Sequence, residues 1–210
     1  MIQSQSNHLL RKNVEFSLPK GQTVHRILNF LSSTLPIFLQ KFMNSGSEAY
    51  LEDEISTFLV YELQDRSKKE DLLFHFDPKK GADFCIQVSP YQIGALPIFT
   101  FETKRLPPTN NKDYVYGDTG GIERFKSEKE GYASHLSVSA MIGYVQRNSF
   151  DHWVQRINNW VDEMIVGNPD AGWCEDDKLI PENITAQYIS THSRPSGTPI
   201  TLYHFWLLMN

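Results

Sequence analysis

Apolar residues recur at helical spacing in three parts of the chain. The first amphipathic stripe covers residues 23–42, where Pro36 is expected to kink the helix or split it in two. The second stripe covers residues 51–63, and the third, which Ser149 can cap, covers residues 150–165. Each stripe predicts a helix whose apolar face packs on a core.

Short apolar runs between turn-forming residues predict strands. A shorter helix, with two glycines at its start, is expected at residues 120–126. The acidic segment 175–178 is expected to be a solvated connector that leads to a final β-hairpin. The expected strands cover residues 72–76, 81–88, 98–106, 139–145, 186–192 and 200–207.

This order of elements predicts a single domain of the α/β or α+β class. We expect a mixed four-stranded central sheet with helices on both faces, extended by the C-terminal hairpin. A chain of 210 residues is long enough for one such domain with a sizeable core. Residues 1–47 would form a helical lead, residues 48–146 the core, and residues 147–210 the last helix and hairpin.

Composition and charge narrow the function classes. The net charge of −5 gives no overall attraction to nucleic acid, so contact with a polyanion must rest on local basic patches. Cys85 and Cys174 lack the spacing of a zinc site and favour a reduced, intracellular protein. Without an apolar signal segment or a run approaching ~18 apolar residues, we expect a cytoplasmic location and no membrane partner.

Candidate chemistry is concentrated in the strand at residues 98–106. Glu102 and Lys104 are two residues apart and therefore project to one face of that strand. If the preceding strand folds back in a hairpin centred on Gln92 and Ile93, Asp83 lies opposite Glu102. Two facing carboxylates repel one another unless a cation lies between them. The pattern therefore indicates a shared divalent metal ion.

Asp83 followed by Glu102-Thr103-Lys104 resembles the D…(D/E)-x-K signature of the PD-(D/E)XK, or restriction-endonuclease-like, nuclease superfamily. The resemblance covers roughly residues 48–146 and implies an αβββαβ core with a further acid on its first helix, for which we choose Glu52 over Glu48 and Glu54.

The same resemblance implies roles for these residues. Asp83, Glu102, Glu52 and the backbone carbonyl of Thr103 would bind Mg²⁺ or Mn²⁺. Lys104 would act on the attacking water and stabilise charge on the phosphate, which makes Asp83, Glu102, Lys104 and Glu52 the expected catalytic residues.

Further residues are candidates for substrate contact. Gln87 shares the strand face of Asp83, and Gly120 and Gly121 could offer backbone amides to a phosphate beside Arg124. Arg105 belongs to a group of cations expected to surround the site and to hold a polyanion: Lys79, Lys80, Lys104, Arg105, Lys112, Arg124, Lys126 and Lys129.

The expected function is metal-dependent cleavage of nucleic acid, as a DNA endonuclease of restriction, defence or repair. Two alternatives stay open: an inactive nuclease-like fold that serves as a binding or structural subunit, and a phosphodiesterase acting on RNA or nucleotides. Because no separate DNA-reading module is visible, a homo-oligomer or larger complex is the expected source of target recognition. His192, Arg194 and His204 are expected to be structural or exposed, and nothing around them indicates a Ser/His/Asp site.

Overall fold

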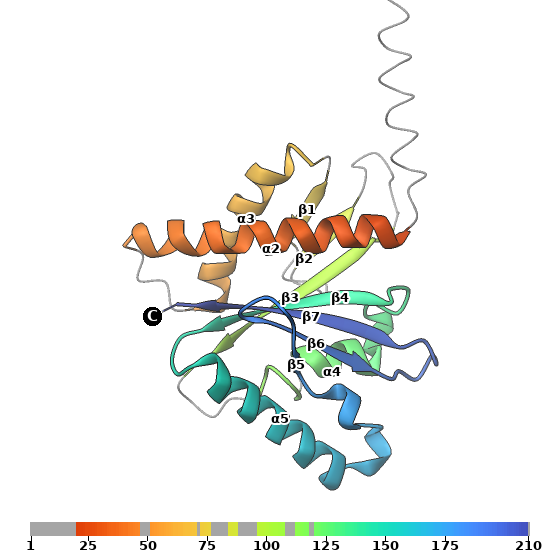
Figure 1. Ribbon diagram of the computed structural model, residues 1–210. Coiled ribbons are helices and arrows are strands. Elements are labelled where there is room, and N and C mark those ends of the chain that lie inside the picture. Colours follow the sequence, from red (N-terminus) through yellow and green to blue (C-terminus); the bar gives the residue numbers. More distant parts are fainter. Residues whose placement is uncertain are drawn as a thin grey trace, which may run out of the picture.

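The computed structural model describes residues 20–46, 51–70, 72–76, 84–87, 96–107, 112–117 and 120–209. Within these residues, seven strands form one sheet in the order β1-β2-β3-β4-β7-β6-β5, with helices on both faces (Figure 1). The strands are β1 (Leu73–Phe76), β2 (Phe84–Gln87), β3 (Phe99–Leu106), β4 (Val138–Val145), β5 (Ile180–Pro181), β6 (Gln187–His192) and β7 (Ile200–Leu208). The longer helices are α2 (Lys20–Asn44), α3 (Glu52–Ser67), α4 (Gly121–Ser127) and α5 (Phe150–Gly167). Three short 3₁₀ turns, η1 (Lys129–Gly131), η2 (Pro169–Ala171) and η3 (Glu175–Asp177), complete the described elements.

The sheet is mixed, as predicted. β1, β2 and β3 pair antiparallel, β3 pairs parallel with β4, and β4 pairs parallel with β7. β7, β6 and β5 then continue antiparallel. The expected hairpin therefore does extend the sheet, but a seventh strand, β5, lies beyond it at the edge. The order α3-β1-β2-β3-α4-β4 is the predicted order of the core elements.

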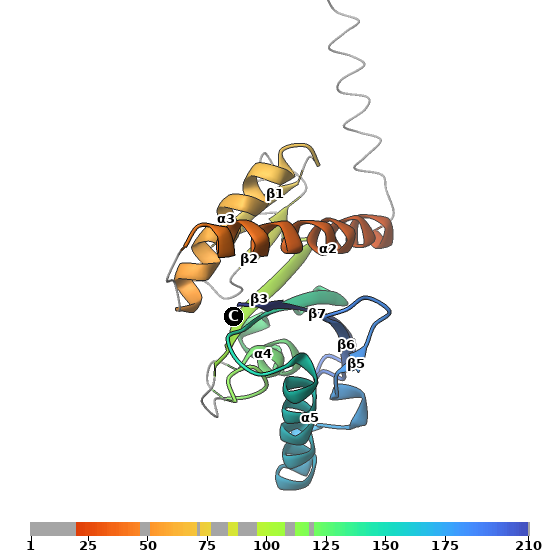
Figure 2. The same ribbon diagram turned by 60° about the vertical axis from the view of Figure 1, so that its left-hand side comes forward.

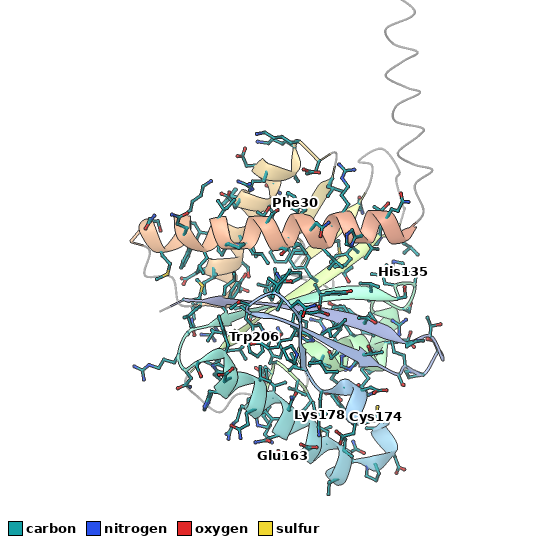
Figure 3. All side chains as sticks on the ribbon, in the orientation of Figure 1. Phe30, His135, Glu163, Cys174, Lys178 and Trp206 are labelled. Carbon is teal, nitrogen blue, oxygen red and sulfur yellow. The ribbon has the colours of Figure 1, made fainter. Side chains whose placement is uncertain are left out.

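Two hydrophobic cores lie on opposite faces of the sheet. α2 and α3 cover one face, where Ile27, Leu59 and Phe101 are buried. α4 and α5 cover the other, where Phe125 and Trp160 are buried. Figure 2 shows the two pairs of helices on either side of the strands, and in Figure 3 Phe30 lies on the α2 side and Trp206 on the α5 side.

Two predictions about the helices, at Pro36 and at Ser149, can be compared with the structure. α2 is one helix with Pro36 inside it, so of the two expected outcomes, a kink or a split, the split is excluded. Ser149 does cap α5, since its side chain accepts a hydrogen bond from the His152 amide. Among the described helices, none has both the length and the apolar content needed to cross a membrane.

Gly143 lets β4 and β7 carry large side chains on the α5 face. A Cβ atom at this position would lie 2.5 Å from Cδ1 of the Trp206 ring. The indole therefore occupies the space that any larger residue at position 143 would need.

Candidate functional site

Strand alternation divides β3 between the two faces of the sheet. Phe99 and Phe101 belong to the core under α2 and α3, whereas Leu106 belongs to the core under α4 and α5. Glu102 and Lys104 lie four and two residues before Leu106 and therefore on the same face of the strand. Both side chains thus start on the α4 face, as the spacing predicts. Glu102 is 0 % exposed and Lys104 is 8 % exposed.

The Glu102 carboxylate is held by two residues near α4. Nη1 of Arg124 donates to both oxygens at 3.2 Å, and the Tyr132 hydroxyl donates to Oε1. The guanidinium of Arg124 also lies over the Tyr132 ring, 4.6 Å from its centroid. A fully buried carboxylate needs such partners, because burial strongly penalises an unpaired charge.

Lys104 and Glu52 form the second ion pair of the site. Nζ of Lys104 lies 3.1 Å from Oε1 of Glu52, the first residue of α3. Oε2 of Glu52 accepts the backbone N–H of Arg105 at 2.9 Å. The described pairing of β3 with β2 ends at Phe101. Glu52 contacts β3 beyond that point, at Lys104 and Arg105, along the edge of the strand.

Glu52 is the acid of α3 that contacts β3. Glu54 instead accepts the backbone N–H of Leu51 and is exposed, and Glu48 lies outside the described residues. The side-chain contribution of Arg105 to substrate binding stays a prediction; its described role is the amide that holds Glu52.

Buried hydroxyl groups fix α3 against the sheet one turn after Glu52. Oγ of Ser56 lies 3.0 Å from Oγ1 of Thr103 and 3.0 Å from the hydroxyl of Tyr144. From the sequence, only a backbone role is predicted for Thr103. A serine on the apolar stripe at position i+4 from Glu52 was the signal that could have revealed this contact.

The β2–β3 register agrees with the prediction wherever it is described. Phe84 pairs with Phe101, Cys85 with Thr100 and Ile86 with Phe99, which is the register from which Asp83 was predicted to face Glu102. Asp83 itself lies outside the described residues, so its place in the site stays a prediction.

Gln87 does not join the site. It pairs with Leu73 at the end of β2 remote from Phe84. Phe84, at the other end of β2, pairs with Phe101 next to Glu102, and three residues of strand separate Gln87 from Phe84 by roughly 10 Å. Sharing a face was therefore not enough to bring Gln87 to Glu102.

The glycines at the start of α4 do not offer their amides to a ligand. The N–H of Gly120 donates to the carbonyl of Gly117 and the N–H of Gly121 to that of Asp113, both at 2.9 Å. The predicted amide contact with phosphate is therefore wrong for both. A Cβ on Gly121 would lie 2.3 Å from Cε of Met141 and 3.3 Å from Cγ of Lys104, so this glycine lets α4 approach the site closely.

The predicted basic surface is largely neutralised by acids. Lys104 and Arg124 pair with Glu52 and Glu102, and Lys112 pairs with Glu163 of α5. Lys126 is 4 % exposed and points away from the site, toward Asp177. Its expected contact with a polyanion is wrong, while Lys79 and Lys80 lie outside the described residues.

A second polar centre, which the sequence pattern did not predict, lies in the α5 core. Asp177 is fully buried, so the expectation that the whole acidic segment is solvated is wrong. Its carboxylate accepts Nζ of Lys126 at 3.0 Å, the Cys174 amide at 2.7 Å and Nδ1 of His192 at 2.5 Å. The carboxylate thereby joins α4, η3 and β6.

The hydrogen bonds continue from His192 across the core. Nε2 of His192 lies 2.7 Å from Oγ of Ser190, which lies 2.8 Å from Nε2 of His204. Nδ1 of His204 lies 2.8 Å from the Tyr114 hydroxyl, which accepts Nε1–H of Trp206 at 2.9 Å. One proton arrangement satisfies every group, with each donor directed toward Asp177 and both histidines neutral.

The pKa shifts agree with that arrangement. Burial lowers the pKa of His204 well below its usual value. Burial also lowers the pKa of His192, although Asp177 opposes the shift. For Asp177 burial acts to raise the pKa, but the hydrogen bonds from His192, from the Cys174 amide and from Lys126 outweigh it and lower the pKa.

Asp177, His192 and Ser190 have the hydrogen-bond order of a hydrolase triad, but they are closed to substrate. Their exposed fractions are 0 %, 0 % and 2 %, and the serine hydroxyl also bonds His204. The chain of groups is therefore structural, as predicted for His192 and His204.

Two surface cavities border α4. One of about 580 Å³ is lined by Tyr116, Gly117, Glu123, Arg124, Ser127 and Lys129. The other, of about 470 Å³, includes Lys126, Trp173 and Arg194 among its lining residues. Arg124, which lines the first cavity, is also the residue that pairs with the Glu102 carboxylate.

Comparison of the chain with family models, with curated proteins and with solved structures gives no match. A functional assignment must therefore rest on the chain's own residues. The described geometry offers two features for such an assignment. They are the ion pairs around Glu102 and Lys104, and the cavity that borders Arg124.

Proposed function

We propose that this protein is a divalent-metal-dependent nuclease that hydrolyses phosphodiester bonds of nucleic acid, with DNA as the expected substrate. The carrying observation is that Glu102 and Lys104 share one face of β3 while Glu52 of α3 contacts Lys104 at 3.1 Å. The element order α3-β1-β2-β3-α4-β4 agrees with the αβββαβ core of the PD-(D/E)XK nucleases that the sequence resembles. We therefore also propose a restriction-endonuclease-like core.

The donor types of the proposed ligands suit a hard divalent cation. Carboxylate and carbonyl oxygens are the ligands that Mg²⁺ and Mn²⁺ prefer, and the buried Glu102 carboxylate needs a positive charge beside it, a need that Arg124 meets in the structure. Glu102, Glu52 and the Thr103 carbonyl would hold the cation together with Asp83. When bound, the cation supplies Lewis-acid stabilisation of the phosphate and lowers the pKa of the attacking water.

The other residues of the site would stabilise charge on the phosphate or position the metal-binding carboxylates. The Lys104 ammonium, held next to Glu52, would donate to a phosphate oxygen as negative charge grows there. Tyr132 keeps the Glu102 carboxylate in one orientation through its hydroxyl. The hydrogen bonds of Ser56 fix α3 and hence Glu52 relative to β3.

A cleavage assay tests the proposal. The purified chain is incubated with duplex DNA, single-stranded DNA and RNA, in Mg²⁺, in Mn²⁺ and in a chelator. We expect cleavage only with metal, and we expect Lys104→Ala to lower the rate by about a hundredfold or more. Lys178→Ala is the matched control, because Lys178 also forms ion pairs, with Asp162 and Glu175, but on the surface (Figure 3).

Wild-type cleavage by a folded Lys104→Ala variant would contradict the mechanism. Cleavage of RNA or nucleotides without cleavage of DNA would assign the same residues to an RNA or nucleotide phosphodiesterase.

One observation favours a second candidate, a nuclease-like fold that acts as a binding or structural subunit. Both described carboxylates of the site are already ion-paired, and the described residues hold no group of three or more side chains suited to a metal ion. Calorimetric titration with Mg²⁺ separates the two: binding that Glu102→Gln removes supports the nuclease, and no specific binding supports the subunit.

A further inference from the structure

The Arg124 side chain connects a buried carboxylate with a surface cavity. Glu102 has no exposed side-chain area, whereas 29 % of the Arg124 side chain is exposed. Both hydrogen bonds between Arg124 and Glu102 come from one nitrogen, Nη1. The pair therefore lacks the two-nitrogen fork that makes arginine–carboxylate pairs strongest.

The cavity beside Arg124 has the chemistry of a phosphate site. Its volume of about 580 Å³ lies in the range of small-ligand pockets. Arg124 and Lys129 bring two positive charges to its lining and Glu123 one negative charge. Glu123 is already engaged, because Oε2 accepts the Gly117 amide at 2.8 Å, and the Ser127 hydroxyl adds a donor.

We propose that this cavity binds a phosphate group of the nucleic acid and that Arg124 couples this binding to cation binding at Glu102. A phosphate offers Arg124 a two-oxygen partner at the cavity and competes with Glu102 for it. Once Arg124 turns to the phosphate, the Glu102 oxygens lose the positive charge that Arg124 supplies. A divalent cation supplies that charge, so each ligand favours the binding of the other.

The coupling is reciprocal, because both ligands shift the same equilibrium of Arg124 between Glu102 and the cavity. Without substrate, Arg124 competes with the cation for Glu102, so cation affinity is held low until a phosphate arrives. The inference rests on the proposed function in one respect, that Glu102 is a cation ligand.

Isothermal titration of the full chain with Mg²⁺ and with thymidine 5′-monophosphate tests the coupling. For the wild-type protein we expect saturating nucleotide to tighten Mg²⁺ binding about tenfold, and saturating Mg²⁺ to tighten nucleotide binding by the same factor. Arg124→Ala should bind Mg²⁺ more tightly than the wild type in the absence of nucleotide, and the nucleotide should no longer change that affinity.

Lys129→Ala keeps the test decisive if Arg124→Ala does not fold, because Lys129 is exposed. It should weaken nucleotide binding and leave Mg²⁺ affinity without nucleotide unchanged. Lys41→Ala is the matched control, since Lys41 is an exposed, ion-paired lysine on α2, and should change neither affinity.

The outcomes separate the two proposals. If Mg²⁺ binds in a Glu102-dependent way but neither ligand changes the affinity of the other, the coupling is overturned and the nuclease proposal stands. If Lys129→Ala leaves nucleotide binding unchanged, the cavity is not the phosphate site. If neither the wild type nor Arg124→Ala binds Mg²⁺, the nuclease proposal fails as well.

Discussion

Replacing Asp177 by asparagine is expected to destabilise the fold strongly, although Asp177 lies outside the proposed site. The substitution keeps the shape of the side chain and removes its charge. The Lys126 ammonium, which is 4 % exposed, then has no anion at 3.0 Å. Breaking a buried ion pair in this way costs about 3–5 kcal/mol. For a domain of this size the loss corresponds to a melting temperature lower by roughly 6 to 20 °C.

A double-mutant cycle identifies the cause of that loss. Lys126→Met alone leaves the Asp177 carboxylate without its main cation and should destabilise the protein. In the Asp177→Asn background the same substitution removes an unpaired ammonium, so it should be neutral or stabilising. Urea unfolding followed by circular dichroism measures all four proteins. Asp65→Asn is the control, since Asp65 pairs with Lys68 on the surface and its loss should not shift the midpoint measurably.

The reasoning would be refuted by either of two results. One is a loss below about 1 kcal/mol for Asp177→Asn, the value of an ordinary hydrogen bond. The other is a Lys126→Met effect that is equal in both backgrounds, because independent sites add.

Two further predictions concern the cores. Burial keeps His192 and His204 neutral with lowered pKa values, so stability should hold above the unfolded pKa of about 6.5 and fall below it, by about 1.4 kcal/mol per pH unit for each histidine protonated only on unfolding. Urea midpoints from pH 7.5 to 5.5 measure this, and a flat profile would contradict it. Gly143→Ala should cost about 1–3 kcal/mol through overlap with Trp206, whereas Gly167→Ala, with open space at its Cβ position, should be neutral in thermal melts; equal effects would count against the packing explanation.

The strand pairing of the core could be predicted because side-chain alternation restricts it. A shift of one residue between β2 and β3 would turn Phe84 or Phe101 away from its core, so burial on the α3 face fixes the register. The same alternation placed Glu102 and Lys104 on one face. Their partners depend on how α3 and α4 dock, which local spacing does not determine.

The buried polar centre could not be predicted for the same reason. Asp177 stands in an acidic run whose other two acids, Glu175 and Asp176, are exposed, and nothing in the run marks one carboxylate as buried. Only the return of the chain through β6 and β7 brings His192 and His204 to it. The acidic composition was read as solvation, whereas burial here is set by tertiary partners.

The short helix α4 connects the two polar centres. Arg124 and Lys126 are two residues apart, which turns their side chains to different sides of a helix, one toward Glu102 and the other toward Asp177. A helix of 7 residues is not stable alone, so its position depends on its tertiary contacts, these two ion pairs among them. Because Lys126 is held rigidly by a buried carboxylate, α4 can keep its place when Arg124 exchanges Glu102 for a phosphate. The buried pair thus restricts the proposed movement to one side chain.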